Sequence, residues 1–112
     1  MSKSILQEET DKECYLCRIL HDEEFKGYLE EHHVMFGPDR SKSEHFGLKV
    51  YLCVAHHRLG KEAVHTNKKT NVLLRQIAQV KFERKYGAEK WMSEFGKNYL
   101  NDEMRERYLG GR

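Results

Sequence analysis

Two short pairs of potential metal ligands stand out in the sequence, each with two residues between its members. Cys14 and Cys17 form the first pair, and Cys53 and His56 form the second. A C-x-x-C turn lets both thiolates reach one ion, and the second pair repeats that spacing with a thiolate and an imidazole. Three thiolates and one imidazole form a tetrahedral set that is typical of closed structural zinc sites. The pattern therefore predicts a structural Zn²⁺ ion, and it uses all three cysteines of the chain.

The cysteine pair has a second interpretation. Cys14 and Cys17 could be a redox pair or plain buried thiols, but a thioredoxin-like pair is expected within a βαβ pattern, which the sequence does not show. An odd number of cysteines would also leave one unpaired in a disulfide framework. The fourth zinc ligand has two candidates, because His56 and His57 are adjacent. The spacing from Cys53 favours His56, and His57 then points elsewhere.

Histidine is unusually frequent, with seven among 112 residues, and an imidazole can bind a metal or transfer a proton near neutral pH. His32 and His33 are neighbours in a predicted strand, so their side chains should face opposite ways and differ in role. If zinc joins the two halves of its ligand set, His57 comes close to this pair. The sequence thus predicts a second imidazole cluster beside the zinc ion. His21 and His45 lie outside the motifs and are expected on the surface.

In their order and spacing, these motifs resemble those of HNH (His-Me finger) endonucleases of the zinc-knuckle type. That family combines a C-x-x-C pair, an Asp-His or His-His pair, and a C-x-x-C or C-x-x-H pair followed by His or Asn. The matching segments are CYLC (14–17), EHHVMFG (31–37) and LCVAHH (52–57). Residues 14–67 look like small HNH proteins of phages and prophages of Gram-positive bacteria, whereas residues 68–112 carry no motif of the family.

The resemblance implies an α+β fold with a small ββα-metal core, in which one catalytic cation lies between a hairpin and a helix. By position, His32 and His57 would bind this cation, Mg²⁺ or Mn²⁺, and His33 would be the general base in the hydrolysis of DNA phosphodiester bonds. An ordinary imidazole pKa of about 6.5 suits such a base, and the cation would stabilise charge on the scissile phosphate. His65 is either a third ligand of the cation or an ordinary histidine at the end of the helix. A backbone carbonyl within 48–50 is expected to orient the ring of His33.

The sequence departs from the family in one place. The family often carries an asparagine shortly before the second knuckle, where it steadies the loop, but this chain has Gly47 and Leu48 there. Ser43, Glu44 and Asn67 are candidates for the same support, and the sequence does not choose among them. The departure keeps a second hypothesis open, a zinc-stabilised nucleic-acid-binding module with an inactive nuclease site.

Four basic residues near the motifs in sequence are candidates for phosphate contacts: Arg40, Lys42, Lys49 and Arg58. Each can equally belong to a solvated basic face. The net charge is only +2, which neither proves nor excludes a nucleic-acid partner, because a local basic patch matters more than the total. DNA is the expected partner, and a homodimer is a further expectation, since many small nucleases cut both strands as dimers.

A hairpin is expected to position these residues, with strands over 32–36 and 48–52. Between the strands, Gly37-Pro38-Asp39 predicts a turn, and a polar loop over 39–47 closes at Gly47. Before the hairpin, 14–17 is expected to form a tight knuckle, and 18–31 to form a short helix or irregular structure.

Two helices are expected after the hairpin. Thr70 or Asn71 would cap the first, which runs to about Tyr86 and ends at Gly87. The second is predicted over 88–100. The aromatic residues of 82–99 are predicted to pack in the core, and the tail after Asp102 is charged.

The chain length predicts a single domain over 1–112, with 1–13 flexible, 14–67 as the motif core and 68–112 as a helical extension. Hydrophobic residues make up 38% of the chain and charged residues 34%, so the core is small and a structural metal would support it. The sequence shows neither an apolar leader nor an apolar run long enough to span a bilayer. We therefore expect no membrane partner and a cytoplasmic protein with reduced thiols, encoded by a phage or prophage in a bacterial host cell.

Overall fold

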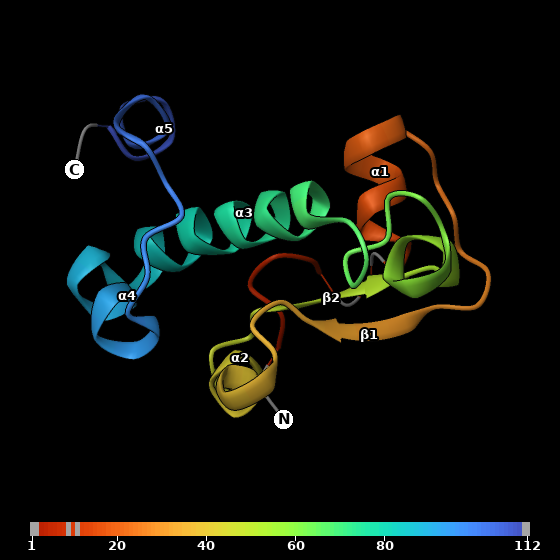
Figure 1. Cartoon of the computed structure of the whole chain (residues 1–112), viewed down its shortest axis with the longest axis horizontal. Helices are drawn as coiled ribbons and strands as arrows, with labels where there is room; N and C mark the ends of the chain where they lie inside the picture. Colours follow the sequence, from red (N-terminus) through yellow and green to blue (C-terminus); the bar gives the residue numbers. More distant parts are fainter. Residues whose placement is uncertain (1–2, 9, 11, 111–112) are drawn as a thin grey trace.

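The computed structural model describes residues 3–8, 10 and 12–110, and it has an α+β fold with one two-stranded antiparallel sheet. Figure 1 shows the longest helix, α3, lying along one side of this sheet, with α2 on the other side. None of the described helices is both long and apolar enough to cross a membrane. In chain order the elements are α1 (Tyr15–His21), β1 (Glu30–His33), the 3₁₀ turn η1 (Gly37–Asp39), α2 (Arg40–His45), β2 (Lys49–Leu52), the π-helical turn η2 (Ala55–Leu59), α3 (Lys68–Tyr86), α4 (Ala88–Phe95) and α5 (Asp102–Leu109).

The predicted hairpin is present, but its first strand begins and ends earlier than expected. His32 pairs with Val50 and His33 with Lys49, and the ladder ends soon afterwards. The reason is local, because the amide of Met35 donates to the hydroxyl of Ser43 at 3.1 Å instead of pairing with β2. The chain therefore turns away from the sheet inside the segment that was predicted as a strand.

The segment 39–47, predicted as a polar loop, contains α2. Pro38 occupies the first turn of η1, where a fixed φ favours a helical start, and α2 follows directly. Gly47 closes the segment with a φ of +73°, and a Cβ atom at this position would collide with the carbonyl oxygen of Lys3. A glycine is therefore required both for the conformation and for the close approach of the N-terminal segment.

The N-terminal segment, expected to be flexible over 1–13, packs against β2 where it is described. The amide of Ile5 donates to Gly47 O at 2.9 Å, and the hydroxyl of Ser4 donates to Lys49 O at 2.6 Å. The side-chain oxygen of Gln7 accepts from the amide of Tyr51 at 2.9 Å. The side chains of Ser4 and Gln7 thus satisfy backbone hydrogen-bonding groups on the outer edge of β2. Residues 1, 2, 9 and 11 lie outside the described residues.

The C-terminal helices differ from the prediction at their ends. Asn67, rather than Thr70 or Asn71, caps α3, and its side chain accepts from the amide of Thr70. The predicted end at Gly87 is confirmed. The second predicted helix stops at Phe95, because Gly96 adopts the left-handed conformation.

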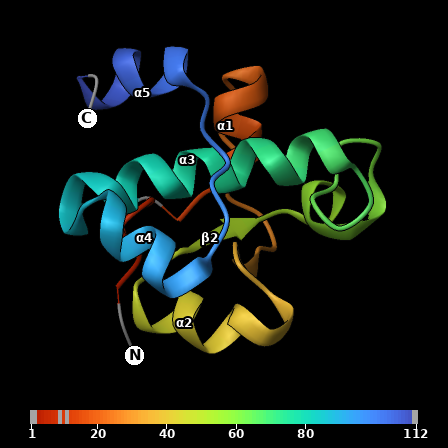
Figure 2. The same ribbon diagram turned by 60° about the vertical axis from the view of Figure 1, so that its left-hand side comes forward.

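One further helix, α5, forms in the segment predicted as a charged tail. Asn101 caps it, and Glu83 of α3 holds it through Arg105 at 2.8 Å. Figure 2 shows α5 lying on the side of α3 away from β2 and α2.

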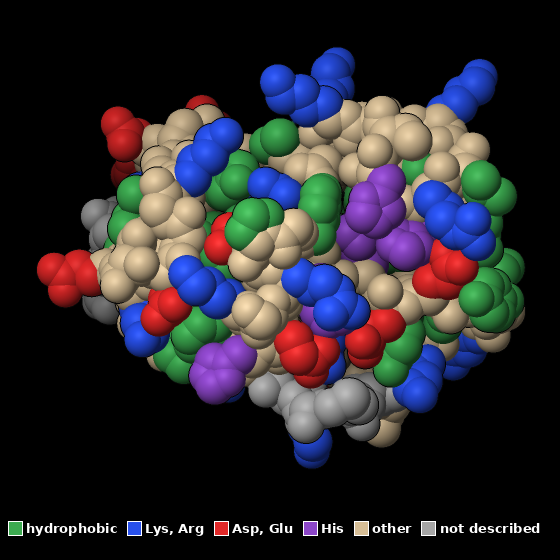
Figure 3. All heavy atoms as spheres, turned by 60° about the horizontal axis from the view of Figure 1, so that its bottom comes forward, with side chains coloured by type: hydrophobic (Ala, Val, Ile, Leu, Met, Phe, Trp, Pro, Cys, Tyr) green, Lys and Arg blue, Asp and Glu red, His purple; other side chains and the backbone are tan. Residues whose placement is uncertain are grey.

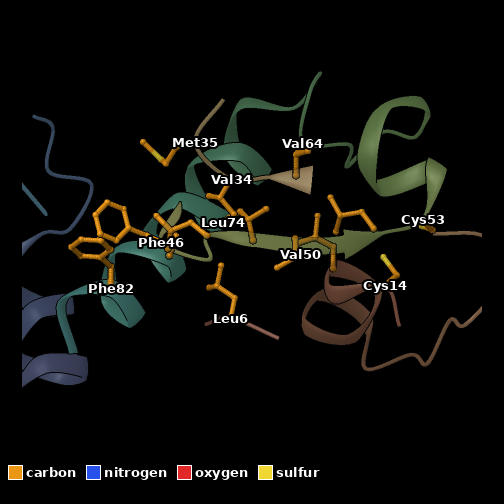
Figure 4. Packing of buried hydrophobic residues seen from close by; sticks show 14 of the residues in the cluster. Leu6, Cys14, Val34, Met35, Phe46, Val50, Cys53, Val64, Leu74 and Phe82 are labelled. Carbon is orange, nitrogen blue, oxygen red and sulfur yellow. The ribbon is translucent and has the colours of Figure 1, made fainter. Parts of the chain in front are cut away.

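The core joins the two halves of the chain into one cluster. Figure 4 shows Val34, Val50 and Leu74 at its middle, Phe46 and Phe82 at one end, and Cys14 and Cys53 at the other. Aromatic rings of the C-terminal helices pack as predicted: the side chains of Phe82 and Trp91 are fully buried, with ring centroids 5.4 Å apart. The cysteine pairs thus lie at the edge of the core, where the hairpin meets α1.

Candidate metal centres

The four predicted zinc ligands meet at one point. Cys14 caps α1, so Cys17 lies in the first turn of that helix, while Cys53 follows β2 and His56 lies in η2. Nδ1 of His56 is 3.6 Å from Sγ of Cys14, 3.3 Å from Sγ of Cys17 and 3.4 Å from Sγ of Cys53. All four ligand atoms lie within 4.8 Å of one another. This cluster is the Cys₃His site.

The spacing of these atoms fits a tetrahedral zinc ion. Bonds of about 2.3 Å to sulfur and about 2.1 Å to nitrogen would place sulfur about 3.6 Å from nitrogen and about 3.8 Å from another sulfur. The sulfurs of Cys17 and Cys53 are 3.9 Å apart, and the three sulfur–nitrogen distances lie close to the expected value. Burial raises the pKa of the Cys14 thiol, and burial together with the neighbouring thiols raises that of Cys17, an effect that a bound divalent cation reverses. The Cys₃His site could hold a metal such as zinc.

A carboxylate supports the imidazole of this site from behind. Nε2 of His56 donates to Glu62 at 3.2 Å, which fixes the tautomer that leaves Nδ1 free for a metal. Glu62 also accepts from His21 at 2.6 Å, so His21, predicted as an ordinary surface residue, takes part in this support.

A second group of imidazoles, His32, His57 and His65, lies on the other side of the same turn. Their ligand nitrogens lie within 4.8 Å of one another, and this group is the three-histidine site. Nε2 of His57 is 3.1 Å from Nε2 of His65. The ring centroid of His32 is 5.2 Å from that of His57 and 5.0 Å from that of His65. The structure thus brings His65 to the two histidines that the family resemblance pairs.

The electrostatics of the three-histidine site favour the neutral, metal-binding form of His32 and His65. Burial, together with charge on the neighbouring histidines, lowers the pKa of His32 to about 3. Burial also lowers the pKa of His65. Nε2 of His32 is buried and has no hydrogen-bond partner in the part of the chain that the structure describes. A buried lone pair without a donor is costly, and a bound cation would satisfy it.

One acidic residue that sequence reasoning missed orients His57. Glu30 begins β1 and accepts from Nδ1 of His57 at 2.7 Å, so Nε2 of His57 carries the free lone pair. Arg58 donates to the same carboxylate at 3.1 Å, and hydrogen bonds from Arg58 and His57 lower the pKa of Glu30 to about 2. A carboxylate behind a metal-binding imidazole is the usual outer support of such a ligand.

His33 points to the opposite face of β1 from His32, as the alternation of a strand requires. Its Nε2 donates to Glu44 at 2.8 Å, where the ammonium of Lys49 also donates at 2.8 Å. Hydrogen bonds from Lys49 and His33 lower the pKa of Glu44 to about 2. The side chain of His33 is only 8% exposed. Glu44, rather than the expected backbone carbonyl, therefore orients this ring.

The three candidates for the missing family asparagine have separate roles. Ser43 supports the loop, because its hydroxyl accepts from Met35 and donates to Leu48 O at 2.5 Å. Glu44 instead binds His33, and Asn67 caps α3. A buried serine thus joins the two ends of the hairpin connection.

The four basic residues predicted to contact phosphate lie in different settings. Lys49 is buried between Glu44 and Glu31, and Lys42 donates to the carbonyl oxygen of Glu94 at 2.6 Å. Arg58 is half exposed on Glu30, and Arg40 is exposed. Figure 3 shows a group of histidine side chains on one face, with basic and acidic side chains beside it, and other histidine atoms apart from that group.

No protein-family model, curated protein or solved structure matches this chain.

A further basic residue, Arg75 of α3, lies beside the three-histidine site and was not predicted. Its guanidinium lies 4.9 Å from the ring centroid of Phe36, donates to the hydroxyl of Tyr99, and contributes to the lowered pKa of His32. Nε of Arg75 is buried with no partner among the described residues. Because α3 brings this side chain from far along the sequence, no local motif could have indicated it.

Proposed function

We propose that this protein is a metal-dependent endonuclease of the HNH type that hydrolyses phosphodiester bonds in DNA. The observation that carries the proposal is the three-histidine site, in which His32, His57 and His65 converge and the buried Nε2 of His32 has no hydrogen-bond partner among the described residues. This site adjoins the Cys₃His site through the neighbouring residues His56 and His57.

The two sites differ in a way that suits different roles. The Cys₃His site offers four ligands, which complete the coordination of zinc and leave no position for a substrate. The three-histidine site offers three imidazoles, and His65 is exposed, so a phosphate can approach from solvent. A divalent cation held there would stabilise negative charge on the scissile phosphate and on the leaving oxygen. The first site is proposed to be structural and the second catalytic.

The chain's own residues would prepare this chemistry. Glu30 holds the ring of His57 so that Nε2 faces the site, and Arg75 adds a positive charge close to His32. The hairpin supplies His32, and η2 supplies His57. A π-helical turn often marks a functional position. Hairpin, turn and α3 are proposed to form the ββα-metal core of this family.

His33 is proposed as the general base. Glu44 holds its Nε2, in the way that a carboxylate holds the imidazole of a catalytic triad and raises the basicity of the opposite nitrogen. The proton from water would therefore go to Nδ1 of His33. Since the ring is largely buried, substrate or water must reach this nitrogen along the edge of β1.

Nicking of supercoiled plasmid tests the proposal. Wild-type protein with its zinc retained is incubated with Mg²⁺ or Mn²⁺, and His57→Ala and His33→Ala are measured beside it. We expect His33→Ala to lower the rate by about 100-fold or more, the usual effect of losing a general base, and His57→Ala to abolish the metal-dependent rate. His45→Ala, a change to an exposed histidine outside both sites, is the matched control and should nick normally.

The outcomes separate the parts of the proposal. If the wild-type protein leaves the plasmid intact both with Mg²⁺ and with Mn²⁺, the nuclease function is contradicted. Normal nicking by His33→Ala rejects this residue as the base, and normal nicking by His57→Ala rejects the three-histidine site as the catalytic one.

A second candidate function is a zinc-stabilised module that binds nucleic acid without cutting it. The small exposed fraction of His33, and its position on the opposite face from His32, favour this alternative. It predicts that the wild-type protein retards DNA in a gel but does not nick it under the same conditions.

A further inference from the structure

A surface hollow adjoins the three-histidine site. It has a volume of about 270 Å³ and lies between Phe36, which follows β1, and the start of α3. His65 lines the hollow and also belongs to the three-histidine site. The ring centroids of Phe36 and His65 are 5.1 Å apart. Whatever occupies the hollow would therefore contact the same imidazole that faces the proposed cation.

An aromatic ring is available on one wall of this hollow. The side chain of Phe36 is 36% exposed, which is unusual for a phenylalanine beside a core. The guanidinium of Arg75 lies over the ring at 4.9 Å from its centroid, and this contact holds the ring in place. A fixed, exposed aromatic ring is the kind of platform on which an unstacked nucleobase packs.

The opposite wall carries polar groups without partners. Within the described part of the chain, the amide of Asn71 and the ammonium of Lys68 make no side-chain hydrogen bond or ion pair. Asn67, by contrast, is fully used, since it caps α3 and donates to Lys61 O. An amide offers both a donor and an acceptor to a base edge, and an ammonium attracts phosphate.

The size of the hollow and the exposed ring on its wall restrict its ligand. A base that is stacked and paired within a duplex presents only its edges, so it cannot lie face to face with a protein ring. An unpaired base can do so, and one base is a suitable size for a hollow of this volume.

We propose that this hollow binds one unpaired nucleotide of a DNA strand, with its base stacked on Phe36 and its edge bonded by Asn71. The backbone of that nucleotide then passes His65, which places the adjoining phosphate at the three-histidine site. The position of the phosphate rests on the proposed function, whereas the binding of the base does not require cleavage.

Fluorescence anisotropy with labelled oligonucleotides tests this inference. The probes are a single-stranded oligothymidine and a blunt duplex of equal length, without added divalent cation and with zinc retained in the protein. We expect the single strand to bind more tightly than the duplex. Phe36→Ala should weaken the binding of the single strand about tenfold, as expected from the loss of one stacking contact, and Phe36→Tyr should retain it. Tyr108→Ala, which truncates an exposed aromatic residue on α5, is the matched control and should bind normally.

A second variant guards against a structural effect of the Phe36 change. Asn71→Ala removes a side chain that makes no hydrogen bond within the described residues, so the fold should persist, and binding should still fall several-fold. Single-strand affinity that is unchanged in both Phe36→Ala and Asn71→Ala overturns the inference, as does a duplex that binds with the same dependence on Phe36. Plasmid nicking is scored separately. If Phe36→Ala weakens single-strand binding but the wild type does not nick plasmid, the nucleotide-binding hollow is supported and the nuclease function is rejected. If the wild type nicks plasmid but Phe36→Ala does not change binding, the nuclease function is supported and the nucleotide-binding hollow is rejected.

Discussion

Nε2 of His57 lies 3.1 Å from Nε2 of His65, and two imidazole nitrogens at this distance need a proton or a cation between them. Nδ1 of His57 already donates to Glu30, so its Nε2 carries a lone pair. His65 must then supply the proton, which a metal would replace. His32 points a third nitrogen to the same place, and that nitrogen has no hydrogen-bond partner among the described residues.

Metal stoichiometry should report this arrangement. We expect two ions per chain when the protein is dialysed against Zn²⁺ or Co²⁺, and one ion per chain for His65→Ala. Loss of a residue that only hydrogen-bonds a metal ligand lowers metal affinity about 10–100-fold. Loss of the ligand itself should lower the affinity for the second ion at least as much. Elemental analysis after dialysis measures both values. His45→Ala should keep two ions, and a His65→Ala protein that also keeps two would exclude His65 as a ligand.

If the Cys₃His site holds a structural zinc ion, as proposed, its removal should unfold the protein. The free energy of zinc binding at such sites is about 10–16 kcal/mol. This value matches or exceeds the free energy of unfolding of a typical domain, about 5–15 kcal/mol. We therefore expect Cys17→Ser, or treatment with a strong chelator, to abolish the cooperative thermal transition followed by circular dichroism. Added Zn²⁺ should restore the transition in the chelated wild type but not in Cys17→Ser. A metal-free protein that still melts cooperatively contradicts a structural role for the Cys₃His site.

Acid should weaken the attachment of α5. Burial raises the pKa of Glu83, but hydrogen bonds from Arg105 and Gln79 lower it by more, so the net shift is downward. A carboxyl whose pKa is lowered in the folded state adds stability above its unfolded pKa, about 4.5, and loses it as the pH falls through the folded pKa.

Glu83→Gln should therefore cost about 1–3 kcal/mol in urea unfolding at pH 7, since it removes the buried carboxylate that Arg105 binds. The difference from wild type should be smaller at pH 4.5 than at pH 7, with Zn²⁺ present in excess at both. The zinc contribution is common to both proteins and cancels in this comparison. Glu106→Gln changes an exposed glutamate of α5 and should have no effect at either pH. A difference for Glu83→Gln that is constant with pH would reject the assigned cause.

Two glycines with similar backbone angles should respond differently to alanine. Gly37 and Gly47 both have a positive φ, +68° and +73°, but only at Gly47 would a Cβ atom meet another group, the carbonyl of Lys3. Gly37→Ala should cost about 1–2 kcal/mol of unfolding free energy from backbone strain alone. Gly47→Ala should cost more, about 3 kcal/mol, because the N-terminal segment must also move away. Equal costs in urea unfolding would show that the segment contributes nothing to stability.

The sequence predicted the four residues of the Cys₃His site because their chemistry is local. Two residues of spacing determine which side chains share a turn, and four ligands of suitable type leave few other pairings. The neighbouring His56 and His57 diverge for the same local reason. Glu30 and Arg75 could not be found in this way, because each reaches its histidine only through the packing of distant elements.

The hairpin was predicted, but two of the short helices, α2 and α5, were not. The helix α2 is six residues long and mostly polar, so it has no apolar periodicity to detect, and α5 buries none of its side chains. The start of α3 was placed too late, because Asn67 precedes a polar first turn that shows no apolar pattern. A periodic pattern of apolar residues indicates only helices that bury an apolar face. It cannot indicate helices that depend on capping and on single ion pairs.

The position of His56 and His57 in the single turn η2 has a thermodynamic consequence. One turn carries a ligand of each site, so an ion bound at either site orders the backbone of this turn. The same backbone must be ordered for the other ion to bind. Binding at the two sites is then linked, and each ion must change the affinity for the other by the same factor. Metal loading of this protein is expected to be cooperative, and occupancy of the Cys₃His site would determine how readily the three-histidine site fills.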